Sequence, residues 1–584
     1  MLKTLAAQIK EFKKDSILTP LFMILEVIME TLIPIMMASI IDNGVEAGDM
    51  NHIYKMGALM VGAAVVSLFA GIMGGKYGAR ASAGFARNLR QKMFERIQGY
   101  SFANIDKYST AGLVTRLTTD VSNIQNAYQM ILRMFTRAPA SLIFAMTMAF
   151  LINAKLASVY LIAVIFLSIL LALGLTKASK YFMTVFKKYD DLNASVQENV
   201  SAIRVVKAFV REDHENSKFK KASENVYKLF LKAENITILA SPVMQITVYT
   251  CILVISWLGA KMIVQDSMTT GQLMSLLTYC MNILMSLMML SMIFVMATMS
   301  FASAERIAEV INEDPSIKNP ENPDYDIPDG SIEFKDVCFK YNKEDTGEPV
   351  LSDINLSINS GETIGIIGGT GSAKSTLVSL ISRLYDTSSG DVLVGGKNVK
   401  KYDLEKLRDN VAVVLQKNVL FSGTILDNLR WGKADATKEE CEEVCRLACV
   451  DDFVEKLPEG YDTYIEQGGT NVSGGQRQRF CIARALLKKP KILILDDSTS
   501  AVDTATDARI RKAFKEEIPD TTKIIIAQRI SSVQNADRII VMDDGKINGF
   551  DTHENLIKTN EIYREVYESQ TGANGDFDEN GGEN

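Results

Sequence analysis

Hydrophobic positions follow two different patterns, which divide the chain near residue 304. Before this point long uncharged stretches recur, and a helix needs ~20 apolar residues to cross a bilayer. Six apolar segments can be marked: residues 17–41, which are interrupted by Glu26 and Glu30, and the uncharged runs 56–75, 138–154, 156–176, 235–260 and 267–304. The third is short, and we expect it to begin nearer Arg133, whereas the sixth is longer than a span requires. We therefore predict an α-helical transmembrane domain with six helices over residues 1–304.

Positive charge predicts the orientation of these spans. With the N-terminus in the cytoplasm, the inner segments hold twenty-six Lys and Arg residues, and the outer edges hold only Lys55, Lys155 and Lys261. An excess of Lys and Arg marks the cytoplasmic side of membrane proteins. The sequence predicts a multi-pass protein of the cell membrane, in contact with the lipid bilayer, with both termini cytoplasmic.

Two of the inner segments are long, covering residues 76–137 and 177–234. Their apolar residues recur at helical spacing and they contain few helix breakers. We predict that each forms two long cytoplasmic helical extensions that meet at a short crossing helix. Residues 109–121 and 205–215 are expected at or near the turning points.

The part of the chain after residue 304 has the pattern of a mixed globular domain. Residues 305–330 are polar and hold four of the twelve prolines, which predicts a linker. Strands expected at 331–334, 362–367 and 491–495 alternate with helical stretches, so we predict an α/β domain over residues 331–570. Residues 571–584 are predicted to be an acidic disordered tail.

Composition excludes some function classes. A net charge of −7 and a pI near 5.4 argue against a nucleic-acid binder. The seven cysteines include no CxxC pair and suggest no disulfide framework. Cys441, Cys445 and Cys449 are spaced i, i+4, i+8, which we interpret as a buried helix face rather than a metal site.

A glycine-rich loop follows the expected strand at 362–367. It consists of Gly368, Gly369, Thr370, Gly371, Ser372, Ala373, Lys374, Ser375 and Thr376, and a helix is expected near Leu377. Backbone N–H groups at a helix N-terminus can cradle a phosphate, Lys374 can reach the β- and γ-phosphates, and the Ser375 hydroxyl can bind Mg²⁺. Ala373 stands where this motif has its last glycine, but a methyl group is small, and we expect phosphate binding to persist.

Two further motifs fit the same chemistry. The buried strand at 491–495 leads into Asp496 and Asp497, at the strand end where parallel sheets bind ligands. Asp496 is placed to orient the Mg²⁺ shell, and Asp497 stands where a general base would polarise water. Upstream, Ser473, Gly474, Gly475 and Gln476 precede a helix and offer a hydroxyl and free N–H groups to another phosphate.

The order of these motifs resembles the ATP-binding cassette family, and the six spans make the chain similar to an ABC exporter half-transporter. The resemblance covers the chain except its acidic tail. It implies ATP and Mg²⁺ as cofactors and ATP hydrolysis coupled to transport. It also implies that Tyr341 stacks on adenine, that Gln416 senses Mg²⁺ and couples to the membrane helices, and that Asp503 lies at a dimer contact. In this family two cassettes pair head to tail, and each ATP lies between the phosphate loop of one chain and the Ser-Gly-Gly-Gln signature motif of the other.

Three residues depart from the family pattern, and all belong to one ATP site. Asp497 stands in place of the catalytic Glu, Gln528 in place of the switch His, and Ala373 in place of a glycine. Asp is one methylene shorter than Glu, and Gln cannot carry the positive charge of a protonated His. The signature motif at 473–476 is intact. This division resembles the degenerate-site subunit of heterodimeric bacterial multidrug exporters and implies a second, different half-transporter as partner.

The leading hypothesis is therefore ATP-driven export of drugs or other small amphipathic compounds. A peptide or lipid exporter is an alternative, as is an ATP-gated channel or receptor with little hydrolysis. Glu26 and Glu30 lie one helical turn apart in the first span and either line the substrate path or form structural hydrogen bonds between spans. Met285, Met289 and Met292 of the sixth span either bind apolar substrates or contact lipid and neighbouring helices.

Overall fold

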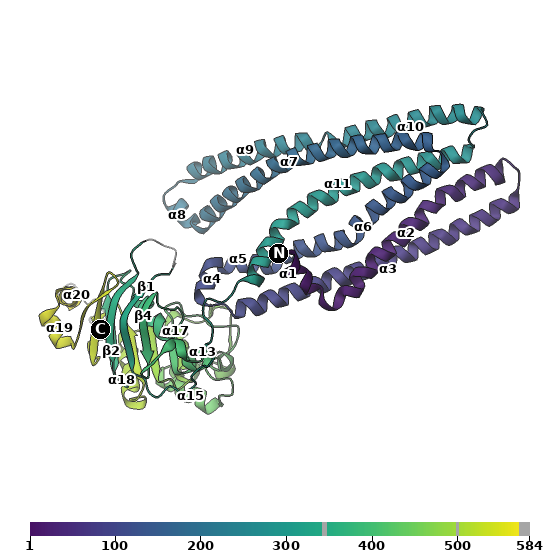
Figure 1. Cartoon of the computed structure of the whole chain (residues 1–584). Helices are drawn as coiled ribbons and strands as arrows, with labels where there is room; N and C mark the ends of the chain where they lie inside the picture. The colour runs from purple at the N-terminus through teal and green to yellow at the C-terminus, as the bar shows by residue number, and fades with distance from the viewer. Residues whose placement is uncertain (342–346, 498–501, 572–584) are drawn as a thin grey trace. The chain divides into compact units, whose positions relative to one another are not determined.

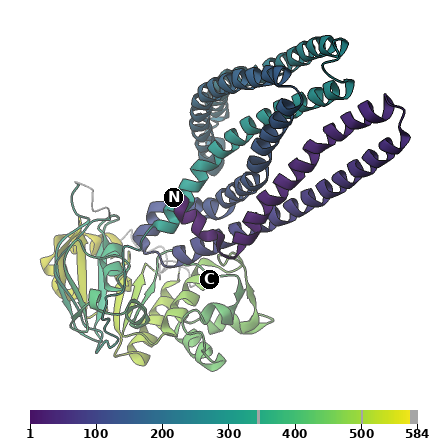
Figure 2. The same cartoon turned by 45° about the vertical axis from the view of Figure 1, so that its right-hand side comes forward.

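The computed structural model describes residues 1–341, 347–497 and 502–571, which form two compact units. One unit holds residues 1–98 and 109–313, and the other holds residues 99–108 and the chain from 314 onward. Figures 1 and 2 show the first as long helices and the second as a mixture of strands and helices. Of the tail expected at 571–584, Thr571 ends the last helix, and residues 572–584 lie outside the described part of the chain.

The first unit is entirely helical within its described residues. Its elements are α1 (Leu2–Ala6), η1 (Ala7–Phe12), α2 (Lys13–Ile40), η2 (Ile41–Val45), α3 (Met50–Gln98), α5 (Thr110–Thr115), η3 (Arg116–Asp120), α6 (Val121–Ile152), α7 (Ala154–Ser201), α8 (Ile203–Ala208), α9 (Glu212–Thr237), α10 (Ala240–Val264) and α11 (Thr270–Asn312). Six helical stretches are long and apolar enough to cross a membrane, namely Leu2–Val45, Met50–Gln98, Thr110–Ile152, Ala154–Phe182, Glu212–Val264 and Thr270–Phe294. The predicted set of six spans is confirmed.

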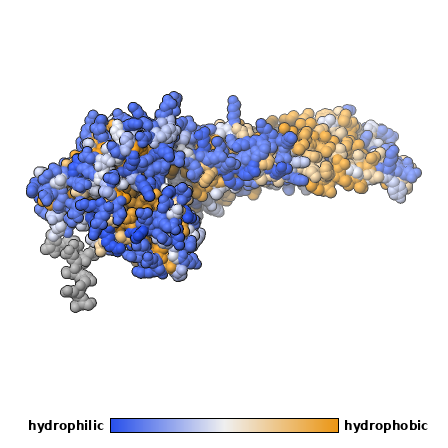
Figure 3. Space-filling view, turned by 90° about the horizontal axis from the view of Figure 1, so that it is seen from below, coloured by the Kyte–Doolittle hydropathy of each residue, from blue (hydrophilic) through white to orange (hydrophobic). Residues whose placement is uncertain are grey.

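A band of hydrophobic surface crosses the helical unit and is bounded by hydrophilic surface (Figure 3). The helices extend beyond the thickness of a bilayer, since α3 has 49 residues and α7 has 48, and a helix rises ~1.5 Å per residue. The apolar parts of these helices are therefore suited to lipid, and their polar parts to water.

Small residues allow α2 and α3 to pack closely. Gly74 and Gly78 of α3 are buried against α2, and a Cβ on Gly74 would collide with the Met23 side chain. Just after α2, Asp42 of η2 accepts hydrogen bonds from the Thr269 hydroxyl at 2.6 Å and the Gly271 N–H at 2.8 Å. These contacts tie the start of α11 to the end of the first span.

A buried carboxylate joins η3 to α11 in the polar part of the first unit. The side chain of Asp120 is 1% exposed and accepts two hydrogen bonds from Arg306, at 2.7 and 2.5 Å. Ser303 donates a third at 2.9 Å. Because Ile307 and Ile311 are also buried here, α11 continues to Asn312, and the first eight residues of the expected linker are helical.

Short helices form the two turning points that were expected near residues 109–121 and 205–215. The second is α8, Ile203–Ala208, which overlaps the expected segment 205–215. The first is α4 (Phe102–Tyr108), which belongs to the second unit and precedes the expected segment 109–121. The expected segment therefore lies next to the turning point: Ser109, with a φ of 54°, interrupts the helix and caps α5, and residues 110–121 lie on the returning helix.

The second unit is built on two sheets. The larger has the order β12-β11-β3-β10-β9-β6, parallel except for the β11–β12 pair, and the smaller antiparallel sheet has the order β2-β1-β4-β5. The strands are β1 (Ile332–Phe339), β2 (Leu351–Ile358), β3 (Thr363–Gly368), β4 (Ser389–Val394), β5 (Lys397–Asn398), β6 (Val411–Val414), β9 (Ile492–Asp496), β10 (Thr522–Ile526), β11 (Arg538–Asp543) and β12 (Lys546–Asp551), with the short pair β7 (Gly423–Thr424) and β8 (Tyr464–Ile465). The predicted α/β class is confirmed.

Helices surround these sheets. They are α12 (Lys374–Ile381), α13 (Leu404–Asn410), α14 (Ile425–Leu429), α15 (Lys438–Leu447), α16 (Asp451–Val454), α17 (Gly474–Leu486), α18 (Thr504–Glu517), α19 (His553–Thr559) and α20 (Glu561–Thr571), with short 3₁₀ turns η4 (Val399–Lys401), η5 (Gly460–Asp462) and η6 (Ile530–Ser532). Cys441 and Cys445 on α15 and Cys449 just after it are all buried, as predicted for an apolar helix face. Burial raises the pKa of the Cys445 thiol to about 12.

Candidate nucleotide-binding site

The glycine-rich loop connects the carboxyl end of β3 to the start of α12. A Cβ at Gly368 would collide with the Met542 carbonyl, so only glycine fits there. Ala373 precedes α12 with φ 68° and ψ 25°, a left-handed conformation that costs a non-glycine residue roughly 1 kcal/mol. The strain explains why the motif usually has glycine at this position, and the loop forms despite it.

Lys374 lies within the curve of this loop. Its ammonium donates hydrogen bonds to the carbonyls of Gly368 and Gly369, both at 2.8 Å, and to the Ser372 hydroxyl at 3.3 Å. Burial lowers the pKa of Lys374, while the carboxylates of Asp496 and Asp497 oppose this shift. The loop therefore concentrates one positive charge and the first N–H groups of α12 where a phosphate can bind.

Ser375 and Asp496 meet at the same edge, as predicted. The Ser375 hydroxyl donates to Asp496 Oδ1 at 2.9 Å, and Asp496 is 6% exposed at the end of β9. Burial raises the pKa of Asp496, as does the neighbouring Asp497, while Ser375 and Lys374 lower it. A buried carboxylate beside a hydroxyl fits Mg²⁺, which takes one or two protein oxygens together with phosphate and water.

Two side chains from neighbouring strand ends converge on Asp497. Gln528, which follows β10, donates to Asp497 Oδ2 at 2.7 Å, and Gln416, which follows β6, donates to the same oxygen at 3.4 Å. Strands β10, β9 and β6 are adjacent and parallel, so their carboxyl ends lie at one edge. The oxygen of the base position is therefore occupied by amide donors, and no histidine is among them.

The signature motif begins α17. The N–H of Gln476 donates to the Ser473 hydroxyl at 3.2 Å, and the Ser473 N–H donates to the Gln476 side chain at 2.9 Å. The side chains of Ser473 and Gln476 thus each accept from the main-chain N–H of the other. The N–H groups of Gly474 and Gly475 belong to the first turn of the helix, where an anion is stabilised.

The remaining sequence-predicted cassette residues flank this site. Tyr341 is half exposed, its hydroxyl lies 2.8 Å from the Thr376 hydroxyl, and its ring meets Tyr385 edge-on at 5.2 Å between centroids. Asp503 caps α18 by accepting from the Thr506 N–H at 2.9 Å, and hydrogen bonds from Thr506 lower its pKa.

Sequence reasoning missed Gln570 of α20. Its side chain donates to the Gln528 carbonyl at 3.0 Å and accepts from the Ile530 N–H at 2.8 Å. No motif marks a glutamine near the end of a C-terminal helix, so only the fold reveals this contact.

In the membrane domain, Glu26 and Glu30 both form ion pairs with Arg137, which the sequence analysis counted only among the loop charges. Arg137 of α6 donates to Glu26 at 2.8 Å and to both carboxylate oxygens of Glu30 at 2.9 Å. The Glu26 side chain is 12% exposed and that of Glu30 is 42% exposed. The ion pairs favour a structural role for Glu26, whereas Glu30 remains accessible. On α11, Met285 and Met292 are exposed and Met289 is half-buried.

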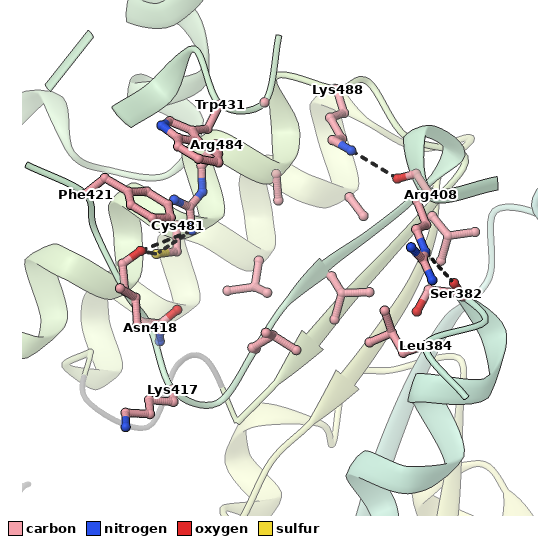
Figure 4. A pocket seen from close by; sticks show the side chains of 18 of the residues that line it. Ser382, Leu384, Arg408, Lys417, Asn418, Phe421, Trp431, Cys481, Arg484 and Lys488 are labelled. Atoms are coloured by element: carbon pink, nitrogen blue, oxygen red, sulfur yellow. Dashed lines mark hydrogen bonds between the residues drawn. The ribbon is translucent and has the colours of Figure 1, made fainter. Parts of the chain in front are cut away.

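A groove of 460 Å³ also lies on the second unit (Figure 4). Phe421 and Trp431 are stacked at its wall, with ring centroids 4.1 Å apart. The cations Lys417, Arg484 and Lys488 line it as well, as does Phe102 of α4. The groove therefore combines an aromatic wall with positive charge.

The fold and this site define a membrane transporter that binds and hydrolyses ATP through a cassette domain. The chain belongs to the ABC transporter family: residues 16–304 match the ABC transporter transmembrane region, and residues 351–500 match the ABC transporter domain. It is an ATP-hydrolysing transporter with an N-terminal membrane domain, like the exporter half-transporters it was predicted to resemble.

Relatives and a solved structure agree with this assignment. The chain is 36% identical to the uncharacterized ABC transporter ATP-binding protein YfiB of Bacillus subtilis, over 95% of this chain and 96% of that protein. It is 33% identical to the ATP-dependent lipid A-core flippase of Desulfotalea psychrophila, over 83% and 84% of the two chains. A bacterial Atm1-family ABC exporter with ATP bound shares the fold, with a TM-score of 0.81 over 96% of this chain and 99% of that chain, at 23% identity.

Proposed function

We propose that this chain is the degenerate-site half of a heterodimeric exporter of drugs or other amphipathic compounds. The observation that carries this is the pair of amide donors on Asp497 Oδ2, from Gln528 at 2.7 Å and Gln416 at 3.4 Å. The Asp497 carboxylate is already engaged by these amides and so is less available to an attacking water, and Gln528 cannot relay a proton as a histidine can. The site is therefore suited to holding ATP rather than cleaving it.

The residues that would bind Mg·ATP at this site support a role in holding the nucleotide. Lys374 and the loop N–H groups would hold the phosphates, and Ser375 with Asp496 would hold Mg²⁺. Bound Mg·ATP supplies negative charge that neutralises Lys374 and joins the two cassettes. Binding at both sites would close the cassettes and open the membrane cavity outward, and hydrolysis at the partner's site would reset them.

The signature motif supports a role in completing the partner's ATP site. Ser473, Gly474 and Gly475 are intact, and Ser473 and Gly474 are exposed at the start of α17. In a head-to-tail dimer they would face the ATP held by the partner's phosphate loop. This chain would thus lack a good base yet complete the site that hydrolyses, with both termini and both cassettes in the cytoplasm.

ATPase activity of the chain alone and with its partner tests this proposal. A homodimer contains two identical sites, each with Asp497 and Gln528, and we expect negligible turnover although ATP binds. Co-expression with a half-transporter that carries Glu and His at the corresponding positions should restore turnover. A homodimer that hydrolyses at ordinary enzyme rates, ~1–10 per second, would contradict the proposal.

The substrate path is proposed to run along α2 and α11. Glu30 is accessible beside Arg137, and Met285 and Met292 expose flexible thioethers that suit varied apolar compounds. Replacing Glu26 and Glu30 by Gln should weaken transport of cationic compounds more than that of neutral ones. Equal loss for both classes would assign the two carboxylates to helix packing with Arg137.

Lipid export is a second candidate because a flippase for lipid A-core is among the relatives. Transport assays with a fluorescent phospholipid and with a cationic dye separate the two candidates.

The groove in Figure 4 is proposed to receive the crossing helix of the partner, because its aromatic wall and cations would suit an apolar helix with acidic flanks. In this chain, the corresponding region exposes Val205 and Phe209 beside Glu212 and Asp213.

A further inference from the structure

The C-terminal helix α20 contacts the main chain of Gln528 and Ile530, the residues on either side of Arg529. Gln528 is the residue at the switch position. Gln570 donates its amide N–H to the Gln528 carbonyl at 3.0 Å, and its amide oxygen accepts from the Ile530 N–H at 2.8 Å. A glutamine side chain has both donor and acceptor groups, so one residue can satisfy two main-chain groups at once. The Gln528–Ile530 segment is thereby held from α20.

Helix α20 is a firm support for this contact. Tyr563, in its first turn, is fully buried, and its hydroxyl lies 2.7 Å from His553 Nδ1. Tyr567 meets the ring of His553 at 5.4 Å between centroids. The helix is therefore anchored before the turn that carries Gln570, and the position of the Gln570 side chain is set by packing.

The main chain that precedes Gln528 is held as well. Ala527 donates its N–H to the Ile366 carbonyl at 3.2 Å, which continues the β10–β3 pairing by one residue. Gln528 is therefore fixed by the sheet on one side and by Gln570 on the other. Between these anchors its side chain reaches Asp497 Oδ2 at 2.7 Å.

We propose that Gln570 is the positioning residue for Gln528 and thereby sets how long this chain's site holds ATP. Both hydrogen bonds of the Gln570 side chain go to main-chain groups, so it acts through the direction it gives to the Gln528 amide. That amide is the donor nearest the base position and can donate to a γ-phosphate when ATP is bound. The proposal rests on the proposed ATP-holding role of this site and adds α20 as its support.

Dissociation of a fluorescent ATP analogue tests the proposal in the purified full-length chain with Mg²⁺. Gln570→Met keeps the side-chain length and removes both hydrogen bonds. We expect about a fivefold faster release of the analogue, the factor that one ordinary hydrogen bond represents. Glu568→Ala, which changes an exposed residue of the same helix, is the matched control and should leave the rate unchanged.

A double-mutant cycle separates positioning from a merely structural role. In a Gln528→Ala background, Gln570→Met should have no further effect on release, because the side chain that it positions is gone. An equal acceleration in both backgrounds would overturn the proposal. Faster hydrogen exchange at the Ile530 amide in Gln570→Met, with an unchanged melting temperature, would verify the loss of the contact in a folded protein.

Two further outcomes keep this proposal distinct from the proposed function. If Gln570→Met folds poorly, Gln570→Glu retains the acceptor for Ile530, loses the donor to the Gln528 carbonyl, and should also accelerate release. If the wild-type chain hydrolyses ATP rapidly by itself, the proposed function fails. If the wild type holds ATP and neither Gln570 variant changes its release, only the positioning role of Gln570 fails.

Discussion

Restoring a free base at Asp497 should restore hydrolysis. We consider the double substitution Asp497→Glu with Gln528→His. It removes the 2.7 Å hydrogen bond from Gln528 to Asp497 Oδ2 and moves the carboxylate outward by one methylene. Gln416, which lies 3.4 Å from the same oxygen, is kept unchanged.

The size of the effect follows from these contacts. A hydrogen bond to a charged group contributes about 1.5–3 kcal/mol, and an oxygen held by such a bond must break it before it can engage an attacking water. Since ~1.4 kcal/mol corresponds to a tenfold rate, this contribution represents about 10- to 100-fold. Misplacement by about 1 Å can cost about 10²-fold more. The two effects overlap, and we expect at least a tenfold rise in turnover of the chain alone.

The assay is phosphate release by the purified full-length chain in lipid nanodiscs with Mg·ATP. Adding Lys374→Ala to the double variant should abolish the gain, which would exclude a contaminating ATPase. The reasoning is refuted if the double variant binds ATP as tightly as the wild type and hydrolyses it no faster.

Four other substitutions have defined outcomes. In the co-expressed complex, Gly475→Asp should nearly abolish ATPase activity, because two like charges ~4 Å apart cost about 4 kcal/mol near a protein surface, whereas Asp497→Asn should change it modestly. Asp120→Asn should lower the stability of the membrane unit by about 1–2 kcal/mol, seen as a lower melting temperature, because one oxygen that accepts from Arg306 becomes a donor. Asp496→Asn should raise the melting temperature at pH 7 without Mg²⁺ and lose the stabilisation that Mg·ATP gives.

The sign of the Asp496 prediction comes from its pKa. Burial raises the folded-state pKa above the ordinary value of 3.8, so the folded protein binds this proton more tightly than the unfolded chain does. The contribution of Asp496 to stability is therefore greatest below pH 3.8 and declines as pH rises through the raised pKa. Asparagine removes that dependence, and an unchanged slope of melting temperature between pH 4 and 7 would contradict it.

The predictions for Asp120 and for the pair Gly475 and Asp497 are each checked by a comparison between variants. Glu309→Gln, at an exposed partner of Arg116, is the control for Asp120→Asn and should cost well under 1 kcal/mol. If Asp497→Asn abolishes activity and Gly475→Asp spares it, the assignment of the two ATP sites is reversed.

The phosphate loop could be predicted from sequence because its geometry is local and its sheet is parallel. Lys374 and Ser375 follow directly from the strand–loop–helix spacing. Asp496 joins them from 121 residues away because the carboxyl ends of parallel strands share one edge. The same rule places Gln416 and Gln528 beside Asp497, where the structure has them.

The contacts that sequence did not reveal depend on tertiary packing between elements without motifs. Arg137 was counted only as a cytoplasmic charge, yet it pairs with Glu26, 111 residues earlier in the chain. Gln570 contacts Ile530 across 40 residues only because α20 packs beside η6. The bounds of the first crossing helix could not be predicted because the apolar spacing of 110–121 does not show that Ser109 interrupts the helix and caps α5.

The membership of α4 in the second unit bears on the order of synthesis. Asp106 accepts a hydrogen bond from Tyr385 at 2.6 Å across 279 residues, and Phe102 meets the same ring at 6.0 Å between centroids. The ribosome thus produces part of the cassette long before the rest of it, with several membrane spans in between. The nascent cassette has to capture α4 after those spans are inserted, so a cassette expressed from residue 314 onward would lack this helix and the contacts that Asp106 and Phe102 make with Tyr385.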